Sequence, residues 1–474
     1  MRIAIIGGGI SGLSAAYYLE QERAKGAPVE YTLFESSNRL GGVMFSDKVE
    51  DCVVEGGPDS FLTEKPWANQ LCAELGIAND LIGSNDSQRV TYILVNGRLV
   101  PMPDGLMFMV PTKLIPTALT SLFSWSTKFK MLGELMHPPQ PVHKDETVAQ
   151  MVERHFGAEV VDRLADPLLS GVYGGDASSL SVRAVLPKFV EMEENYGSLC
   201  RAMLAGRKKM AAMQKAKGYA PKPLFSSLRG GMQQLIDAIV ARLTPQWLRT
   251  STVISQLSQK ENGWELVTPQ GIERFDSVIF ATPARIASTM LARVNAQLSD
   301  DLGKVEYSSS ITVTLGYKRE DLKACKPGFG FLVPRSEGTR MLATTYVHTK
   351  FPFRAPDNKA LVRCFLGGAK DQSVLRLSDE EVTAVVRKEL QQITGLKADP
   401  WFVKVYRWDR AMAQYTPGHL ERIERIGETL RQMRTLSIAG NFYKGIGVPD
   451  CIRTGKEAAQ HMASLARESQ SAKA

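Results

Sequence analysis

Three glycines in the first dozen residues have the spacing of a dinucleotide-binding turn. Gly7, Gly9 and Gly12 follow a short apolar run and precede a helix-forming stretch. In such a unit the glycines permit a tight turn, a close backbone approach to a pyrophosphate, and close packing of helix on strand. The N–H groups at the start of the helix, around Ile10 and Ser11, then face the phosphate charge. The sequence therefore predicts a dinucleotide site at this end of the chain.

A carboxylate stands where such a site needs one. The apolar stretch 30–34 reads as a second strand, and Glu35 follows it directly, with Ser36 next. A carboxylate at the end of this strand accepts hydrogen bonds from a ribose hydroxyl. The alternative, a glycine turn in another kind of α/β protein, lacks this combination of two strands, helix and acid.

Two more glycine-dense turns follow within a short distance. Arg39 and Gly42 lie in the stretch SSNRLGG, where a guanidinium and free backbone suit a pyrophosphate, although R-x-G-G alone is usually an ordinary turn. Gly57, Pro58 and Asp59 lie in the second turn. Turns of this kind beside a dinucleotide fold suggest backbone that passes close to a flavin.

Composition narrows the classes of partner. The chain has 474 residues, a formal net charge of +8 and a pI near 9.0, which suits nucleic acid, anionic lipid or an anionic small substrate. No nucleic-acid motif accompanies the charge, so the last two are favoured. Six cysteines and six histidines are scattered without metal-ligand spacing, which predicts reduced thiols and no metal.

The compartment is expected to be the cytoplasm. No apolar run reaches the roughly 18 residues of a spanning helix. The first strand begins almost at Met1, so no signal peptide is expected.

The segment 104–136 is apolar, rich in Met and Phe, and carries lysines with almost no acid. One interpretation is an interfacial segment, with apolar residues in the headgroup layer and lysines toward anionic lipid. The other is a helical subdomain with an ordinary core, which periodicity alone favours.

Two later glycine-rich stretches also have features of a ligand-binding site. The glycine-rich stretch 167–176 is expected to be an irregular loop that lines something. A strand at 436–441 ends in glycine and leads to a helix that is expected to start at Cys451, with Asp450 as its cap.

These stretches together resemble the FAD-dependent amine-oxidase superfamily. The specific phrases are GGGISGLSAAY, FESSNRLGG, EGGPDSF and IAGNFYKGIGVPDCIRTG. Within that superfamily the chain resembles the oxygen-dependent bacterial porphyrinogen oxidases of haem biosynthesis. DPLLSGVYGGDASSLSVR, GFGFLVP, TTYVHTKFPFRAPD and FLGGA carry this likeness over nearly the whole length.

The resemblance implies non-covalently bound FAD and a discontinuous domain plan. The fold class is α/β, with a Rossmann-like FAD-binding domain, a mixed-sheet substrate domain and a helical, membrane-associating subdomain. The FAD-binding domain comprises 1–85, 225–304 and 425–470, the substrate domain 86–103 and 305–424, and the helical part 104–224. To the FAD residues above it adds Val253 beside the adenine and, near the flavin, Gly445, Val448, Pro449 and Asp450.

The resemblance also implies the residues around the substrate. They are Gly171 on one side, with Phe329, Gly330, Leu332, Leu342 and Phe365 on the other. Animal and plant members place a propionate-binding arginine near Thr91, whereas this chain has Arg89 and Arg98 nearby. Which cation binds a propionate is therefore open at this point.

The implied reaction removes six electrons from protoporphyrinogen IX or coproporphyrinogen III, with O2 as acceptor and H2O2 as product. Hydride transfer to a flavin needs little acid–base machinery, so no catalytic residue is assigned. The rivals are a flavin monoamine or polyamine oxidase, for whose aromatic cage Phe442 and Tyr443 are a partial match, and a non-catalytic porphyrin-binding flavoprotein. The expected partners are the porphyrinogen, O2, an anionic membrane on the cytoplasmic face, a second copy of the chain, and a ferrochelatase-type enzyme that receives the product.

Overall fold

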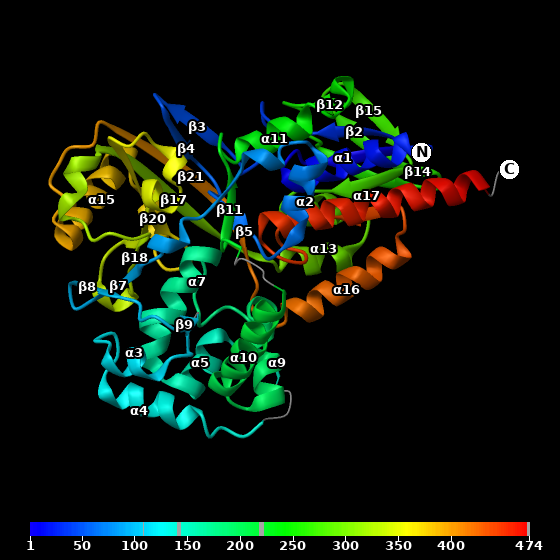
Figure 1. Cartoon of the computed structure of the whole chain (residues 1–474). Helices are drawn as coiled ribbons and strands as arrows, with labels where there is room; N and C mark the ends of the chain where they lie inside the picture. The colour runs from blue at the N-terminus through cyan, green and yellow to red at the C-terminus, as the bar shows by residue number, and fades with distance from the viewer. Residues whose placement is uncertain (108, 140–143, 218–221, 472–474) are drawn as a thin grey trace. The chain divides into compact units, whose positions relative to one another are not determined.

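The computed structural model of the chain describes residues 1–107, 109–139, 144–217 and 222–471. The chain forms two compact units, each built from separated segments (Figure 1). The first unit contains Met1–Ser84, Leu224–Glu306 and Glu421–Ala474, and the second contains Asn85–Pro223 and Tyr307–Leu420.

The first unit is built on a five-stranded parallel sheet. Its strand order is β12-β2-β1-β16-β22. The strands are β1 (Arg2–Ile6), β2 (Glu30–Phe34), β12 (Leu248–Arg249), β16 (Ser277–Phe280) and β22 (Leu436–Ile438). β1 pairs with β2 on one side and β16 on the other, so its run of Ile and Ala is buried on both faces.

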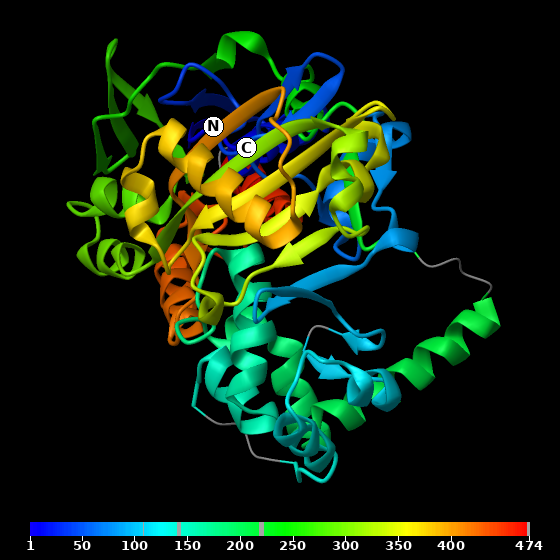
Figure 2. The same cartoon turned by 90° about the vertical axis from the view of Figure 1, so that its left-hand side faces the viewer.

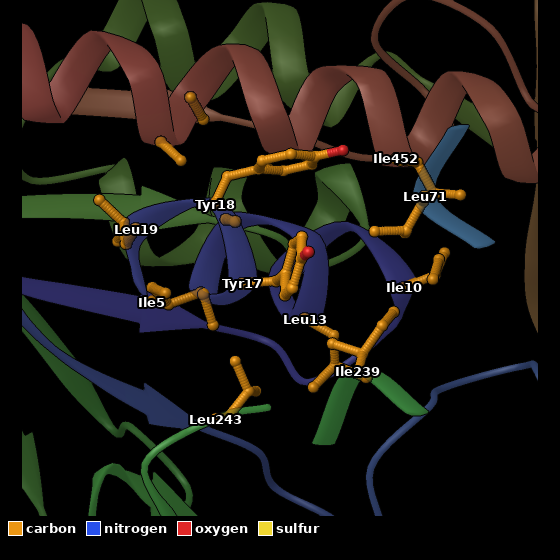
Figure 3. Packing of buried hydrophobic residues seen from close by; sticks show 14 of the residues in the cluster. Ile5, Ile10, Leu13, Tyr17, Tyr18, Leu19, Leu71, Ile239, Leu243 and Ile452 are labelled. Carbon is orange, nitrogen blue, oxygen red and sulfur yellow. The ribbon is translucent and has the colours of Figure 1, made fainter. Parts of the chain in front are cut away.

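The first helix of the chain packs on this sheet, and two later helices pack against it. The helices of the first unit are α1 (Ile10–Ala24), α2 (Pro66–Glu74), α11 (Gln233–Val240), α12 (Ala284–Leu291), α13 (Ala296–Gly303), α16 (His419–Gln432) and α17 (Val448–Ser471). Figure 3 shows Tyr18 of α1 directed toward α17, and Leu13 directed toward Ile239 of α11. The first helix after the glycine turn is therefore enclosed by the core.

Short strands and turns complete the first unit. They form a hairpin of β3 (Ser46–Val49) with β4 (Cys52–Glu55), a sheet of β5 (Phe61–Leu62), β11 (Phe225–Leu228) and β6 (Leu81–Gly83), and a sheet of β13 (Gln256–Lys260), β14 (Gly263–Thr268) and β15 (Gly271–Phe275). The 3-10 turns are η1 (Ala78–Asp80) and η4 (Pro245–Trp247).

The second unit contains a seven-stranded mixed sheet in the order β21-β17-β20-β19-β18-β7-β8. The strands are β7 (Thr91–Val95), β8 (Arg98–Pro101), β17 (Glu306–Lys318), β18 (Gly330–Leu332), β19 (Met341–Tyr346), β20 (Lys359–Gly367) and β21 (Phe402–Gln414). The helix α15 (Asp379–Thr394) covers one face and closes an apolar core, as the yellow-orange helix in front of the strands in Figure 2 shows.

The rest of the second unit is mainly helical. Its helices are α3 (Leu114–Leu119), α4 (Trp125–Glu134), α5 (Val148–Phe156), α6 (Ala158–Val160), the π-helical turn η3 (Val161–Ala165), α7 (Asp166–Tyr173), α8 (Val182–Val185), α9 (Pro187–Tyr196), α10 (Leu199–Lys217) and α14 (Val347–Lys350). The small elements are β9 (Leu106–Met107), β10 (Val110–Pro111), η2 (Asp86–Gln88), η5 (Arg319–Ala324), η6 (Arg335–Glu337), η7 (Pro352–Arg354) and η8 (Gln372–Arg376). Within the described ranges no helix is both long and apolar enough to cross a bilayer.

The predicted fold class is confirmed, and two local expectations are wrong. The stretch 167–176 is not an irregular loop, because α7 extends to Tyr173 before Gly174 ends it with a left-handed conformation. The helix expected from Cys451 starts at Val448, so Asp450 lies inside its first turn and is not its cap. The segment 104–136 begins with the β9–β10 pair before α3 and α4, and its residue 108 lies outside the described residues.

Candidate functional site: a dinucleotide cradle and an apolar sheet face

The glycine turn after β1 has the geometry that its sequence predicts. Gly7 has φ +110°, and a Cβ there would overlap the carbonyl oxygen of Ala281. A Cβ at Gly12 would overlap the carbonyl oxygen of Gly7, so α1 lies directly on the turn. Gly9 precedes α1 without a side-chain cap, and the first turn contains no acidic residue. The helix N-terminus, where Ile10 is buried, therefore presents uncapped N–H groups of the kind that bind phosphate.

The second glycine turn packs against the first, backbone on backbone. The Gly41 N–H donates to the Gly8 carbonyl at 2.8 Å, and Gly9 forms an isolated bridge with Gly41. A Cβ on Gly42 would lie 3.1 Å from the Gly9 Cα. Two turns that the sequence separates by more than 30 positions thus form one cradle without side chains, which suits close approach by a pyrophosphate.

Glu35 holds this cradle together at the end of β2. Its Oε2 accepts from the Gly8 N–H at 2.8 Å, and its Oε1 accepts from the Ser37 N–H at 2.8 Å and the Ser36 Oγ at 3.3 Å. The carboxylate is partly exposed, so lone pairs stay accessible beside these bonds. Its contact with a ribose stays a prediction.

Val253 lies next to Glu35. The Thr252 N–H donates to the Glu35 carbonyl at 2.9 Å, and the Ser251 N–H donates to the Ser37 carbonyl at 2.8 Å. Val253 itself is 56% exposed, which is unusual for a valine beside a core strand. The structure therefore brings the predicted adenine contact to the predicted ribose contact.

The guanidinium of Arg39 binds the turn that follows it. It donates to the carbonyl of Gly42 at 2.5 Å and to that of Met44 at 3.3 Å, and it lies over the Phe45 ring at 5.0 Å. Burial lowers the pKa of Arg39 and outweighs the negative charge of Glu35, which would raise it. Arg39 therefore shapes the backbone of the cradle as well as adding positive charge to it.

The turn at Gly57–Asp59 is tied to the same region. A Cβ on Gly57 would overlap the Val43 carbonyl oxygen. The Asp59 carbonyl accepts from the Ser227 Oγ at 2.6 Å, which fixes the backbone around Pro58. Close backbone packing, rather than a side-chain role, explains the glycine here.

The C-terminal segment presents a second helix N-terminus. Gly445 has φ +124°, and a Cβ there would overlap the carboxylate of Asp450. Asp450 is buried in the first turn of α17, behind Val448 and Pro449, and the Lys65 Nζ lies 2.5 Å from its Oδ2. Sequence analysis named Asp450 but gave no signal for Lys65.

Sequence analysis also missed Gly455, which sets the crossing of α1 and α17. A Cβ on Gly455 would overlap the carbonyl oxygen of Ser11, at the start of α1. The small residues Gly455, Ala458 and Ala459, all packed against the core, are the signal that could have identified this close helix contact.

These features match a flavin dinucleotide. An uncapped helix start, side-chain-free turns and a carboxylate beside an exposed valine are what the phosphates, ribose and adenine of FAD require. Among the described residues no cluster of His, Cys, Asp or Glu could hold a metal ion.

Three of the predicted substrate residues, Gly171, Leu332 and Phe365, lie at one face of the sheet of the second unit. Leu332 of β18 pairs with Ala343, which pairs with Phe365 of β20, so these three side chains share a face. The residues that alternate with them along β18 and β20 point into the core under α15, so Leu332 and Phe365 lie on the sheet face that is turned away from α15. α7 packs against it, and a Cβ on Gly171 would lie 3.9 Å from Leu332 Cδ2.

Leu342 and the Phe329–Gly330 pair have different surroundings. Leu342 lies at a register shift in β19, and its Cδ1 points toward Gly368. Phe329 is buried, and its N–H donates to the Val90 carbonyl at 2.8 Å. A Cβ on Gly330 would overlap the Thr344 carbonyl oxygen, so sheet packing alone requires glycine at this position.

The structure does not bring Arg89 and Arg98 together. Arg89 ends η2 before β7, whereas Arg98 begins β8 opposite Val95, the last residue of β7. Six extended residues separate the two ends by about 15–20 Å. Both arginines are exposed, and no single carboxylate can bind both.

A third arginine, which sequence analysis missed, lies on the apolar face. Arg363 of β20 pairs with Thr345, which pairs with Gly330, which pairs with Thr91. Arg363 is therefore on the same rung as Thr91, and its guanidinium lies 5.0 Å from the centre of the Phe365 ring. Only the strand register reveals this relation, since the two positions are far apart in the chain.

Comparison with known families defines the class of protein. Residues 10–463 match the model of the flavin containing amine oxidoreductase family. The chain belongs to this family, and its cofactor is FAD.

Its curated relatives narrow the class further. It is 34% identical to a coproporphyrinogen III oxidase of Bacillus subtilis, over 96% of both chains. It is 30% identical to a chloroplastic protoporphyrinogen oxidase of Nicotiana tabacum, over 97% of this chain and 84% of the relative. A solved structure from Exiguobacterium, described as a protoporphyrinogen oxidase, has a TM-score of 0.86 at 29% identity and covers 98% of this chain and 99% of that one. The likeness to porphyrinogen oxidases that the sequence motifs indicate is confirmed.

Proposed function

We propose that this protein is an FAD-dependent porphyrinogen oxidase of haem biosynthesis, with coproporphyrinogen III as its first candidate substrate. The observation that carries the proposal is the apolar sheet face beside α7, where Leu332, Phe365 and the bare Gly171 lie together. An electron-rich macrocycle built of apolar pyrrole rings needs such a surface. The relatives named coproporphyrinogen III oxidase, at 30–34% identity, favour that substrate over protoporphyrinogen IX.

The chain's own residues would bind and orient the macrocycle rather than transfer protons. Bound FAD supplies the acceptor for hydride, in three two-electron steps, and O2 removes the electrons as H2O2. Apolar contacts from Leu332, Leu342 and Phe365 would hold the ring, and Arg363 would face a propionate from the rung on which Thr91 lies. Arg89 and Arg98, at opposite ends of β7, would face different propionates if they bind any.

The rival amine-oxidase function fits the structure less well. Covalent flavin attachment needs a reactive thiol, but burial raises the pKa of Cys451, the cysteine in the C-terminal flavin segment, to about 12. Phe442, half of the expected aromatic pair, is fully buried and cannot form the wall of an open cage. Non-covalent FAD and a porphyrinogen substrate therefore form the better-supported proposal.

The deciding experiment mixes the purified holoenzyme anaerobically with each porphyrinogen. Without O2 we expect the flavin absorbance to bleach, because each FAD accepts two electrons from the porphyrinogen. In aerobic assays, where O2 regenerates the flavin, we expect porphyrin fluorescence to grow and coproporphyrinogen III to give the higher kcat/KM. Admission of air should return the flavin spectrum and release H2O2, three molecules for each porphyrin. A flavin that stays oxidised with both porphyrinogens, or turnover of benzylamine-type substrates without porphyrin formation, would contradict the proposal.

A surface role accompanies this function. Six apolar side chains on and next to α3 and α4 are between 53% and 81% exposed; this apolar patch consists of Ile115, Leu119, Trp125, Phe129, Leu132 and Met136. Lysines lie beside it, and the Lys128 Nζ is 4.5 Å from the Trp125 ring centre. Such a patch with basic neighbours supports peripheral binding to an anionic membrane, on the cytoplasmic face. A homodimer and a product-receiving ferrochelatase-type partner stay predictions.

A further inference from the structure

A buried ion pair joins the helix and the strand that frame the apolar sheet face. The Lys370 Nζ pairs with the Asp166 Oδ2, and the two side chains are only 8% and 10% exposed. Asp166 is the first residue of α7, which carries Gly171, and Lys370 follows the end of β20, which carries Phe365. The pair thus connects two elements that are distant in sequence at the point where both approach the site.

The same carboxylate also holds the segment that follows α7. The Asp166 Oδ1 accepts from the Ala177 N–H at 3.2 Å, just beyond the helix C-terminus. Burial lowers the pKa of Lys370 to about 8, with the charge of Asp162 opposing the shift. The pair therefore lies in a dry environment, where its electrostatic interaction is screened little by solvent.

Close contacts fix the C-terminal end of α7. The Gly174 carbonyl accepts from the Ala369 N–H at 2.8 Å, and a Cβ on Gly368 would lie 2.9 Å from that carbonyl oxygen. The Gln414 Nε2 donates to the Tyr173 carbonyl at 2.8 Å. With Lys370 at one end and these bonds at the other, little freedom is left for the helix to slide.

A π-helical turn precedes α7. This turn, η3, lies between α6 and α7 in one continuous helical stretch, and it changes the helical register by its wider ring of hydrogen bonds. π-turns of this kind are frequent at functional sites. The position of α7 therefore depends on this register and on the contacts that α7 makes with neighbouring segments, which include the Lys370–Asp166 pair.

We infer that Lys370 and Asp166 are positioning residues that set the separation of Gly171 from Leu332, and with it the fit of the substrate macrocycle. The inference rests on the proposed function. A buried ion pair adds little net stability compared with an apolar pair of similar size, so a role in geometry accounts for it better than a role in stability.

The test removes both charges at once. In the double variant K370M/D166N no charge is left unpaired, and the substituted amide keeps an oxygen for the Ala177 N–H. We expect flavin content and melting temperature close to those of the unaltered protein. We expect the KM for the porphyrinogen to rise about fivefold or more while kcat stays within about twofold, the pattern of lost uniform binding. A KM unchanged beside lowered stability would overturn the inference.

Two further variants make the result specific. K304M/D300N removes an exposed Lys–Asp pair, with 57% and 53% exposed side chains, and should change neither KM nor stability. Gly171→Leu would place a side chain over the sheet face and should raise KM without unfolding α7, since only Leu332 lies within 4 Å of the added Cβ.

The two proposals can then fail separately. If Gly171→Leu leaves KM unchanged, the proposed substrate face is wrong. If it raises KM but K370M/D166N does not, only the positioning role is wrong. If the double variant does not yield flavin-loaded protein, the single variant Lys370→Gln replaces it, because glutamine keeps a hydrogen-bond donor toward Asp166. A raised KM in this variant supports the positioning role, and an unchanged KM contradicts it.

Discussion

At the scale of single residues, the dinucleotide site depends on absent side chains. Gly7, Gly12 and Gly42 each lie where a Cβ would touch backbone atoms of another turn or strand, which cannot move aside as a flexible side chain can. The sequence predicts these positions because the G-x-G-x-x-G spacing reports a backbone requirement. It gives no such signal for Gly455, whose neighbour Ser11 is more than 400 positions away.

Gly12→Ala should therefore weaken flavin binding. The added methyl group overlaps the Gly7 carbonyl oxygen, so α1 must move off the turn, at a cost of about 1–3 kcal/mol. We expect the flavin-to-protein absorbance ratio of the purified variant to fall by about tenfold. The matched control is Gly133→Ala in α4, where nothing lies within 4 Å of the new Cβ and a helix-favouring residue should stabilise by about 0.5–1 kcal/mol. Equal flavin content in Gly12→Ala would contradict the prediction.

At the scale of elements, the alternation of strand, glycine turn and helix was predictable, and α7 was not. Pro167 and Gly171 both suggest a loop, yet proline is tolerated in the first turn of a helix and a single helical glycine costs only about 1 kcal/mol. Contacts with Lys370 and Gln414, from remote strands, outweigh that cost. Local helix propensity could not predict that this stretch is helical, because those contacts depend on the tertiary fold.

The helices of the second unit are joined by a buried charged cluster around His155. Its Nδ1 lies 3.0 Å from Glu134 of α4, and its Nε2 lies 3.0 Å from Glu193 of α9. Burial disfavours the charged imidazolium, but the two carboxylates outweigh it and raise the pKa of His155. Arg154 pairs with Glu193 and Glu146, and the Glu134 carboxylate accepts N–H groups at the start of α10. One histidine therefore links three helices.

The contribution of His155 to stability should depend on pH. Since its pKa is raised on folding, the contribution is fully present below the ordinary pKa of 6.5 and is lost as the pH rises through the folded-state value. Burial alone would raise the pKa of Glu193, but its bonds to His155 and Arg154 outweigh burial and lower this pKa to about 2. The contribution of Glu193 to stability is therefore lost only as the pH falls from 4.5 through about 2. His155→Gln should cost about 1.5–3 kcal/mol at pH 6 and clearly less at pH 9.

Urea denaturation of both proteins at the two pH values measures this difference. The control is His461→Gln, because His461 is exposed and its Nε2 contacts only the Arg434 carbonyl among the contacts described for it. This control should show no comparable pH-dependent loss. A loss in His155→Gln that is equal at pH 6 and pH 9 would show that the imidazole stabilises the helices only as a neutral group.

At the scale of the whole molecule, motifs predicted that distant segments form one site but not how they meet. Glu35 and Val253 were both expected at the cofactor, and the backbone bonds of Thr252 to Glu35 bring them together. The substrate residues were less predictable, because strand register decides which side chains share a face. That register separates Arg89 from Arg98 and places Arg363 on the rung of Thr91.

The apolar patch is the feature that the folded interior does not explain. Its six side chains stay largely exposed after α3 and α4, the cyan helices of Figure 1, have packed, and large exposed apolar side chains on neighbouring helices indicate an interaction surface. Because lysines lie around it and the chain carries a net charge of +8, we expect the unaltered protein to bind vesicles that contain phosphatidylglycerol. Added salt should weaken this binding, while vesicles of phosphatidylcholine alone should bind less at every salt concentration.

Trp125→Glu combined with Phe129→Glu should remove the apolar part of that attraction. Both side chains are 68% exposed, so the substitutions should leave melting temperature and flavin content unchanged. Loss of two inserted aromatic rings, worth more than the roughly 1.4 kcal/mol of a tenfold change, should lower partitioning into the anionic vesicles at least about tenfold. Ile272→Glu, at a 67% exposed apolar site in the first unit, adds negative charge outside the patch and should change partitioning far less. Equal partitioning of the double variant and the unaltered protein would exclude the patch as the membrane contact, and a similar loss in Ile272→Glu would attribute binding to net charge instead.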